Sequence, residues 1–129
     1  MYIFVNGELM QGLSMHHLMD TAHFVKRDRT APVYRLYSIE NRYPAMIMAV
    51  APENGFAISG EIYDVPDTLW PTLFENERRL GLYRGHIWLQ DGTGMGGILS
   101  VRELCHTFPD ISSYGGWREY LASLPPSQR

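Results

Sequence analysis

The stretch Pro66-Asp-Thr-Leu-Trp-Pro-Thr-Leu-Phe-Glu-Asn-Glu-Arg-Arg79 interrupts a series of strand-like segments with a helical pattern. Trp70, Leu73 and Phe74 recur at helical spacing, and the next position of that apolar stripe is Glu77. Because a proline is tolerated only in the first turn of a helix, Pro71 predicts a short helix that begins near residues 68–70. A carboxylate therefore completes the buried face of this helix.

Glu77 has two interpretations. A carboxyl group packed against apolar side chains has a raised pKa, because burial disfavours its charged form, and it can then exchange a proton near neutral pH. Alternatively, Glu77 pairs at the surface with Arg78, Arg79 or Arg84, and such structural ion pairs outnumber catalytic carboxylates. Glu75 lies on the opposite side of the helix and is predicted to face water.

Before and after this helix, the sequence predicts short strands bounded by Pro, Gly, Asn or Asp. Strands are predicted at residues 2–6, 22–26, 33–39, 45–50, 58–65, 85–89 and 97–101, and further helices at 14–20 and 114–122. Strands dominate without regular alternation with helices, which is typical of an α+β domain. We expect a small mixed β-barrel with helices packed outside, formed by one domain over residues 1–123, and a flexible tail at 124–129.

Two glycine-rich loops are candidate binding segments. The loop from Gly7 to Gly12 follows the first strand, and its backbone N–H groups could face a small anion, although a structural turn is the commoner reason for two such glycines. The segment from Asp91 to Gly97 lacks the Lys-Ser/Thr pair of a phosphate-binding loop and is not followed by a helix, so a hairpin turn is predicted.

Neither the histidines nor the single cysteine forms a recognisable metal or nucleophile motif. His16 and His17 are neighbours that point about 100° apart on a helix, and no spacing typical of metal ligands is present. Cys105 and His106 are adjacent in sequence and are poorly placed to act as nucleophile and base, so Cys105 is predicted to be a buried thiol. We expect no metal and no cofactor.

Composition narrows the classes of function. The chain has 129 residues, 45% of them hydrophobic, and a formal net charge of −3 from 11 Lys+Arg and 14 Asp+Glu. This length supports a core without disulfides or metals. The acidic balance argues against nucleic-acid binding, and no apolar run is long enough to span a bilayer. The first residues lack the pattern of a signal peptide, so a cytoplasmic protein is expected.

The order of the motifs resembles the γ-glutamylcyclotransferase-like, or AIG2-like, family over nearly the whole chain. The resemblance is carried by Tyr2-Ile-Phe-Val-Asn-Gly-Glu-Leu-Met-Gln-Gly12, Ile58-Ser-Gly-Glu-Ile-Tyr63, Leu73-Phe-Glu-Asn-Glu77 and Leu82-Tyr-Arg84. Within this superfamily the chain is most similar to the C-terminal domain of allophanate hydrolases, through Gly12-Leu-Ser-Met-His-His17, Arg29-Thr-Ala-Pro-Val-Tyr-Arg-Leu-Tyr37 and Gly115-Gly-Trp-Arg-Glu-Tyr-Leu121.

The cyclotransferase resemblance implies an enzyme that cyclises γ-glutamyl amides to 5-oxoproline without a cofactor. The loop after the first strand would hold the substrate α-carboxylate, and Glu77 would move the proton. In this loop the cyclotransferase resemblance assigns the role to Gly7, Glu8 and Leu9. With the allophanate hydrolase resemblance included, the predicted substrate-binding residues are Asn6, Gly7, Glu8, Leu9, Met10, His17, Arg35, Tyr37 and Tyr83. One departure matters: the family pattern Tyr-Gly-Ser/Thr-Leu reads Asn6-Gly7-Glu8-Leu9 here, and Glu8 would repel a substrate carboxylate unless it turns outward.

The allophanate hydrolase resemblance implies a different substrate, a small ureido carboxylate such as N-carboxycarbamate, and a possible amidase partner. His17, Arg35 and Tyr37 match segments of that subfamily. If Glu8 faces the cavity, His17 or Arg35 is expected as its counter-charge, which predicts weak activity on γ-glutamyl dipeptides. A third hypothesis is a non-catalytic module that binds a carboxylate or docks a partner through Trp70, Trp88 and Trp117.

Overall fold

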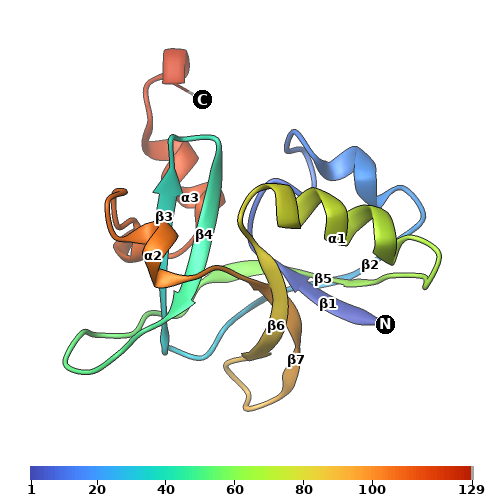
Figure 1. Ribbon diagram of the computed structural model, residues 1–129, viewed down its shortest axis with the longest axis horizontal. Coiled ribbons are helices and arrows are strands. Elements are labelled where there is room, and N and C mark those ends of the chain that lie inside the picture. Colours follow the sequence, from blue (N-terminus) through green and yellow to red (C-terminus); the bar gives the residue numbers. More distant parts are fainter. Residues whose placement is uncertain (129) are drawn as a thin grey trace.

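A computed structural model describes residues 1–128 (Figure 1). It contains seven strands, three short α-helices and three 3-10 turns within this range. The strands are β1 (Tyr2–Val5), β2 (His23–Arg29), β3 (Tyr34–Ile39), β4 (Tyr43–Met48), β5 (Ser59–Asp64), β6 (Tyr83–Trp88) and β7 (Gly94–Leu99). The helices are α1 (Trp70–Arg79), α2 (Arg102–Cys105) and α3 (Trp117–Ser123), and the 3-10 turns are η1 (His16–Met19), η2 (Ser112–Tyr114) and η3 (Pro126–Gln128).

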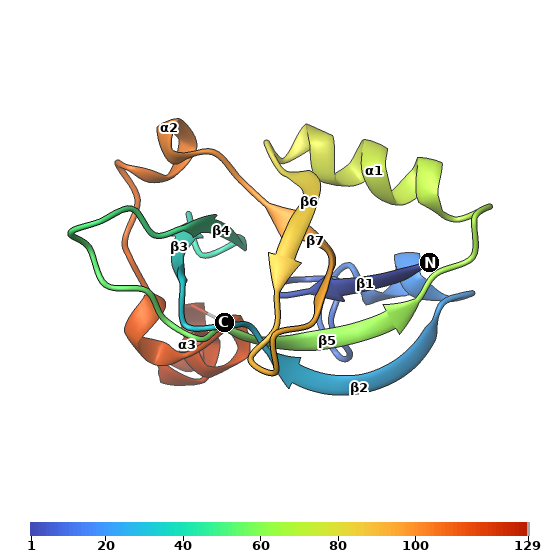
Figure 2. The ribbon, with the colours of Figure 1, turned by 90° about the horizontal axis from the view of Figure 1, so that it is seen from below.

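Five strands form one mixed sheet in the order β2-β5-β1-β7-β6. β1 is central, antiparallel to β5 and parallel to β7, and its residues Ile3, Phe4 and Val5 are buried. β3 and β4 form a separate antiparallel hairpin. Figure 2 shows α1 over one side of the sheet, and the hairpin near α2 and α3 at the far end of the molecule.

The expected α+β class is confirmed, but the expected barrel is wrong: the sheet is not closed. The edge strands β2 and β6 meet only at one end, through an isolated bridge between Thr30 and Leu89 and a hydrogen bond from the Ala31 amide to the Trp88 carbonyl. β3 and β4 leave the sheet and pack on the C-terminal segment instead, where the Ile111 amide donates to the Leu36 carbonyl. Two strands that could have completed a barrel thus serve as a second layer.

Helix α1 follows the predicted pattern. Trp70, Leu73 and Glu77 are its buried residues, and Pro71 lies in the first turn, where its missing N–H costs no intrahelical hydrogen bond. The helix ends at Arg79, and two residues later Gly81 has a φ of +79°, which is accessible to glycine at little cost. Glu77 is therefore held in the last turn of a helix whose end is fixed by the backbone.

Other segments differ from the predictions mainly at their ends. The helix predicted at 14–20 is the 3-10 turn η1, β2 extends three residues beyond its predicted end, and α2 was not predicted. The hairpin predicted around residues 91–97 is confirmed by the pairing of β6 with β7. Arg129, in the predicted tail, lies outside the described residues. The helices of residues 1–128 are all too short to cross a bilayer.

Candidate functional site

A narrow pocket lies where the loop after β1 meets the C-terminal half of α1 and the start of β4. Its cavity volume is about 20 Å³, which is room for about one water molecule. Most of the wall is apolar. The lining residues are Val5, Asn6, Gly7, Glu8, Leu9, Met15, Tyr43, Pro44, Asn76, Glu77, Leu80, Leu82 and Ile98.

Gly7 brings the loop close to β4. A Cβ atom at this position would lie 2.7 Å from Cδ of Pro44, a separation that real Cβ atoms essentially never show. The glycine in the loop is therefore required by packing against β4. The Met10 amide donates to the Gly7 carbonyl at 3.0 Å and closes the turn.

Glu77 is buried, with 5% of its surface exposed, and its side chain lines the pocket. Burial raises the pKa of its carboxyl group from 4.5 to about 7. The arginines that could have paired with it are engaged elsewhere: Arg78 and Arg79 bind Glu75, and Arg84 lies over the Trp70 ring. Among residues 1–128 the Glu77 carboxyl group has neither a hydrogen-bond partner nor a counter-charge. It can both hold and release a proton at neutral pH.

Glu8 lines the same pocket, but its carboxylate is fixed to the protein. Oε1 accepts hydrogen bonds from the backbone N–H and the hydroxyl group of Ser14, at 3.2 and 2.6 Å. Oε2 accepts one from Nε1 of the buried Trp117 at 2.5 Å. Glu8 thus ties the loop to α3. The counter-charge expected from His17 or Arg35 is replaced by neutral donors.

Two other polar side chains of the pocket also serve the fold. The amide nitrogen of Asn6 donates to the Ile98 carbonyl at 3.1 Å and connects β1 to β7. The hydroxyl group of Tyr43 donates to the Leu80 carbonyl at 2.8 Å, which holds β4 against the end of α1. Both residues shape the pocket by holding its walls together.

The structure brings together five of the predicted site residues, namely Asn6, Gly7, Glu8, Leu9 and Glu77. Three others lie elsewhere. Met10 is buried beside a different hollow, that of Arg118 and Ser59, because it follows Leu9 in the turn and points away from it. His17 is exposed on η1, where its Nδ1 pairs with the Ser14 carbonyl. Tyr83 stands on the edge strand β6 with 47% of its surface exposed.

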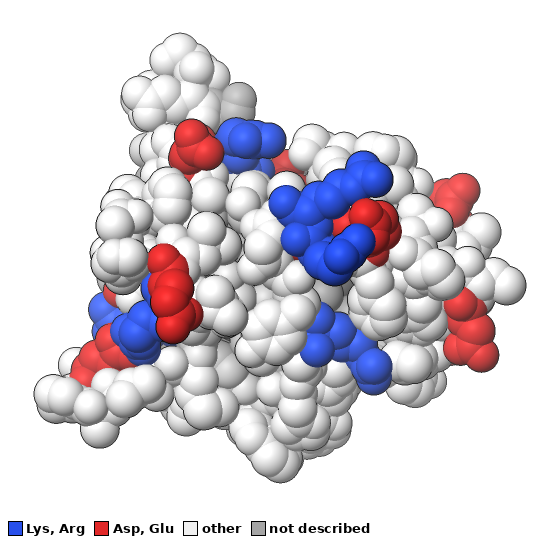
Figure 3. Space-filling model, in the orientation of Figure 1, with Lys and Arg blue, Asp and Glu red and all other residues white. Residues whose placement is uncertain are grey.

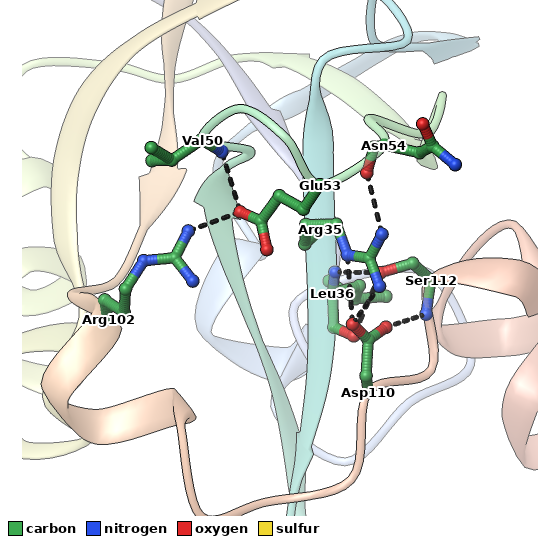
Figure 4. Close-up of polar contacts among 8 residues, drawn as sticks. All are labelled: Arg35, Leu36, Val50, Glu53, Asn54, Arg102, Asp110 and Ser112. Carbon is green, nitrogen blue, oxygen red and sulfur yellow. Dashed lines mark hydrogen bonds and ion pairs between the residues drawn. The ribbon is translucent and has the colours of Figure 1, made fainter.

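Arg35 belongs to a different cluster, which Figure 4 shows, and Tyr37 forms a β-bridge with Asp110 of that cluster. Both nitrogens Nε and Nη2 of Arg35 donate to Oδ2 of Asp110, at 3.0 and 2.5 Å, and Nη1 donates to the Asn54 carbonyl. Tyr37 is buried on β3, next to this ion pair. This cluster joins the β3–β4 hairpin to the C-terminal segment, so these two residues do not contribute to the pocket.

Sequence reasoning missed Asn76, Tyr43 and Pro44 as pocket residues. Asn76 stands beside Glu77 in the same motif and could have been included on that ground. Tyr43 and Pro44 reach the pocket only because the β3–β4 hairpin folds over the loop, and no local sequence signal predicts that contact.

An outer hollow adjoins the pocket. It shares Glu8, Met15, Tyr43 and Leu80 with the pocket and adds Ser14 and Arg42. On the face shown in Figure 3, blue and red side chains are interspersed, and a mixed cluster lies over α1. A polyanion would bind to a broad positively charged patch, and that face has none.

The central β1, the helix α1 that follows β5 and the open mixed sheet form an α+β fold similar to that of an AIG2-like protein. The chain belongs to the family of the allophanate hydrolase C-terminal domain, whose model matches residues 1–122. A comparison with curated proteins gives no match.

Three solved structures illustrate the relationship. The protein c4763, described as specific to uropathogenic E. coli, has 35% identity and a TM-score of 0.87, with 96% of this chain and 97% of that chain covered. Allophanate hydrolase of Kluyveromyces lactis has 21% identity and a TM-score of 0.83, with 94% of this chain covering 21% of that chain. An AIG2-like protein from Mus musculus has 20% identity and a TM-score of 0.64, with 86% and 85% covered.

Proposed function

We propose that this protein is a small-molecule enzyme in which Glu77 is the general acid and base for a reaction at an amide or ureido group. One observation carries the proposal: a buried carboxyl group with a pKa of about 7 and no partner among residues 1–128 lines a pocket beside the β1 loop. Leaving a buried ionisable group unpaired costs stability, and such costs are typical of functional sites. No cofactor is needed for this chemistry.

The first candidate reaction is the cyclisation of a γ-glutamyl amide. The substrate α-amine attacks its own γ-carbonyl carbon, and the Glu77 carboxylate takes the proton that the amine loses. The same carboxyl group then gives that proton to the departing amine as the carbon–nitrogen bond breaks, so the products are 5-oxoproline and a free amine. Glu77 ends in its starting state, as a catalyst must.

The second candidate reaction is the breakdown of a ureido carboxylate of the N-carboxycarbamate type. The bond between nitrogen and one carboxylate carbon breaks, carbon dioxide leaves, and the electron pair stays on nitrogen. Protonated Glu77 donates its proton to that nitrogen, which yields carbamate, and solvent restores the proton to Glu77. At neutral pH about half of the Glu77 population carries the required proton.

One observation favours the second reaction. The Glu8 carboxylate occupies the loop where a cyclotransferase would hold the substrate carboxylate, and its hydrogen bonds to Ser14 and Trp117 keep it there. An amidase that releases the ureido carboxylate is then the natural partner of this chain.

The test is turnover by wild type, E77Q and the control variant E75Q. Glu75 is half exposed on the same helix and pairs with Arg78 and Arg79, so its replacement leaves the pocket intact. One substrate set contains γ-glutamyl amines and dipeptides, assayed by 5-oxoproline release. The other is N-carboxycarbamate generated in place from allophanate by an amidase, assayed by carbon dioxide release.

We expect E77Q to lose at least about 100-fold in kcat, the usual contribution of a general acid or base, while E75Q stays close to wild type. Activity of E77Q within about tenfold of wild type would contradict the proton-transfer role. Absence of turnover by the wild type on both substrate sets would favour the non-catalytic hypothesis, in which the pocket only binds a carboxylate.

A further inference from the structure

A second group in the pocket lacks a partner. In residues 1–128, two buried side-chain nitrogens have no hydrogen-bond partner, Nε1 of Trp70 and Nδ2 of Asn76. Asn76 precedes Glu77 on α1 and lines the same pocket. Because nearly all buried polar groups in proteins are hydrogen-bonded, an unpaired amide donor beside an unpaired carboxyl group calls for an explanation.

Other polar side chains of the pocket differ from Asn76 and Glu77 because they are hydrogen-bonded within the protein. The amide nitrogen of Asn6, the Tyr43 hydroxyl group and the Glu8 carboxylate are all bonded to other parts of the protein. They hold the walls together. The amide nitrogen of Asn76 and the carboxyl group of Glu77 are bonded to no other part of residues 1–128, so both are available to a ligand, and the two residues are adjacent in sequence.

We propose that Asn76 Nδ2 is the donor that binds the carbonyl or carboxylate oxygen of the substrate next to the bond that Glu77 acts on. This inference rests on the proposed function. In the cyclisation, negative charge builds on the γ-carbonyl oxygen. In the breakdown of the ureido carboxylate, negative charge leaves the departing carboxylate and gathers on the nitrogen and on the carboxylate that remains. A fixed donor at the γ-carbonyl oxygen, or at the carboxylate that remains, stabilises that charge. A neutral amide suits this task beside Glu77, because a cationic donor would lower the pKa of the carboxyl group.

The experiment uses the variant N76L, which keeps the branched shape of the side chain and removes its donors. Leucine is larger than asparagine and a better helix former. E75Q on the adjacent position is the matched control. Two stable probes replace the substrates: 5-oxoproline, which presents a lactam carbonyl, and malonate, which has the shape and charge of N-carboxycarbamate. The resonances of the Asn76 side-chain amide are assigned by their absence in N76L and followed by NMR as each probe is added.

We expect at least one probe to shift the Asn76 amide resonances, and N76L to bind that probe about tenfold more weakly than wild type and E75Q, the factor expected for one hydrogen bond. N76L should also melt no lower than wild type, because it removes an unpaired buried donor. A residue with a merely structural role would instead lower the melting temperature when replaced.

Three outcomes would overturn the assignment: no shift of the Asn76 amide with either probe, N76L affinity equal to that of wild type, or a clear loss of stability in N76L. The result is separable from the test of Glu77. If E77Q keeps its turnover while N76L loses probe binding, the proton-transfer role fails and the Asn76 site stands. If E77Q loses turnover while N76L binds like wild type, only the Asn76 assignment fails.

Discussion

At the scale of single residues, Glu77 is distinguished by a carboxyl group that has no ion-pair or hydrogen-bond partner among residues 1–128. It lies within one helical turn of Arg78, Arg79 and Glu75, and yet both arginines turn outward to Glu75. The helical period explains this division, because the stripe of Trp70 and Leu73 carries Glu77 inward. A carboxyl group in this position is stable mainly in its protonated form.

The first prediction concerns stability and pH. The pKa of Glu77 is 4.5 in the unfolded chain and about 7 in the folded one, so between these values the folded protein binds more protons. Stability contributed by this group is therefore present below pH 4.5 and lost as the pH rises to about 7. The full loss is about 3 kcal/mol, from a difference of about 2.5 pKa units.

E77Q lacks this titration, so its free energy of unfolding should exceed that of wild type by an amount that grows from pH 5 to pH 7 and then levels off. Urea unfolding at several pH values measures it, with E75Q as the control. A constant difference between E77Q and wild type over this range would show that Glu77 titrates normally.

At the same scale, Glu77 shows what the sequence could and could not predict about the site. The apolar stripe alone predicted that this carboxylate points inward. The stripe did not exclude an ion pair between Glu77 and an arginine at the surface. Helical spacing alone does not determine whether Arg78 and Arg79 bind Glu75 or Glu77. For Glu8, the sequence predicted a charge in the loop, but its partner Trp117 is 109 residues away in the chain, beyond any local pattern.

At the scale of elements, the contact between the β1 loop and β4 shapes the pocket. A second prediction follows for G7A. The added methyl group would lie 2.7 Å from Pro44, so the hairpin must move, and overpacking of this kind costs about 1–3 kcal/mol. Denaturant unfolding checks this, with Q11A on the exposed part of the same loop expected within about 0.5 kcal/mol of wild type. A G7A variant as stable as wild type would mean that Pro44 does not press on the loop.

Strands and helices were predictable to different degrees. β1, β3, β5 and α1 follow from their own periodicity and from the Pro and Gly residues that bound them. The predicted barrel was wrong, because a barrel closes only if the two edge strands of the sheet pair along their length, and local sequence does not determine that pairing. β3 and β4 pair with each other as a separate hairpin and do not extend the sheet. The short helix α2 has only four residues, too few for a recognisable period.

At the scale of the whole molecule, the two candidate reactions differ in the protonation state of Glu77 that they require. Cyclisation needs the carboxylate as a base, so kcat/KM should rise with pH and level off above about 7. Breakdown of the ureido carboxylate needs the acid, so kcat/KM should be highest below about 7 and fall above it. We expect the falling profile, measured with N-carboxycarbamate generated in place. A profile that rises through pH 7 would assign the base role instead.

The central claim is that the Glu77 carboxyl group exchanges its proton near neutral pH inside the folded protein. The most direct measurement is an NMR titration of the side-chain carboxyl carbons of glutamate, with the Glu77 signal assigned by its absence in E77Q. The structure predicts a midpoint near pH 7 for Glu77, whereas the half-exposed Glu75 titrates below 4.5 because Arg78 binds its charged form. A Glu77 midpoint near 4.5 would contradict the claim, because the group would then be a charged side chain in contact with water.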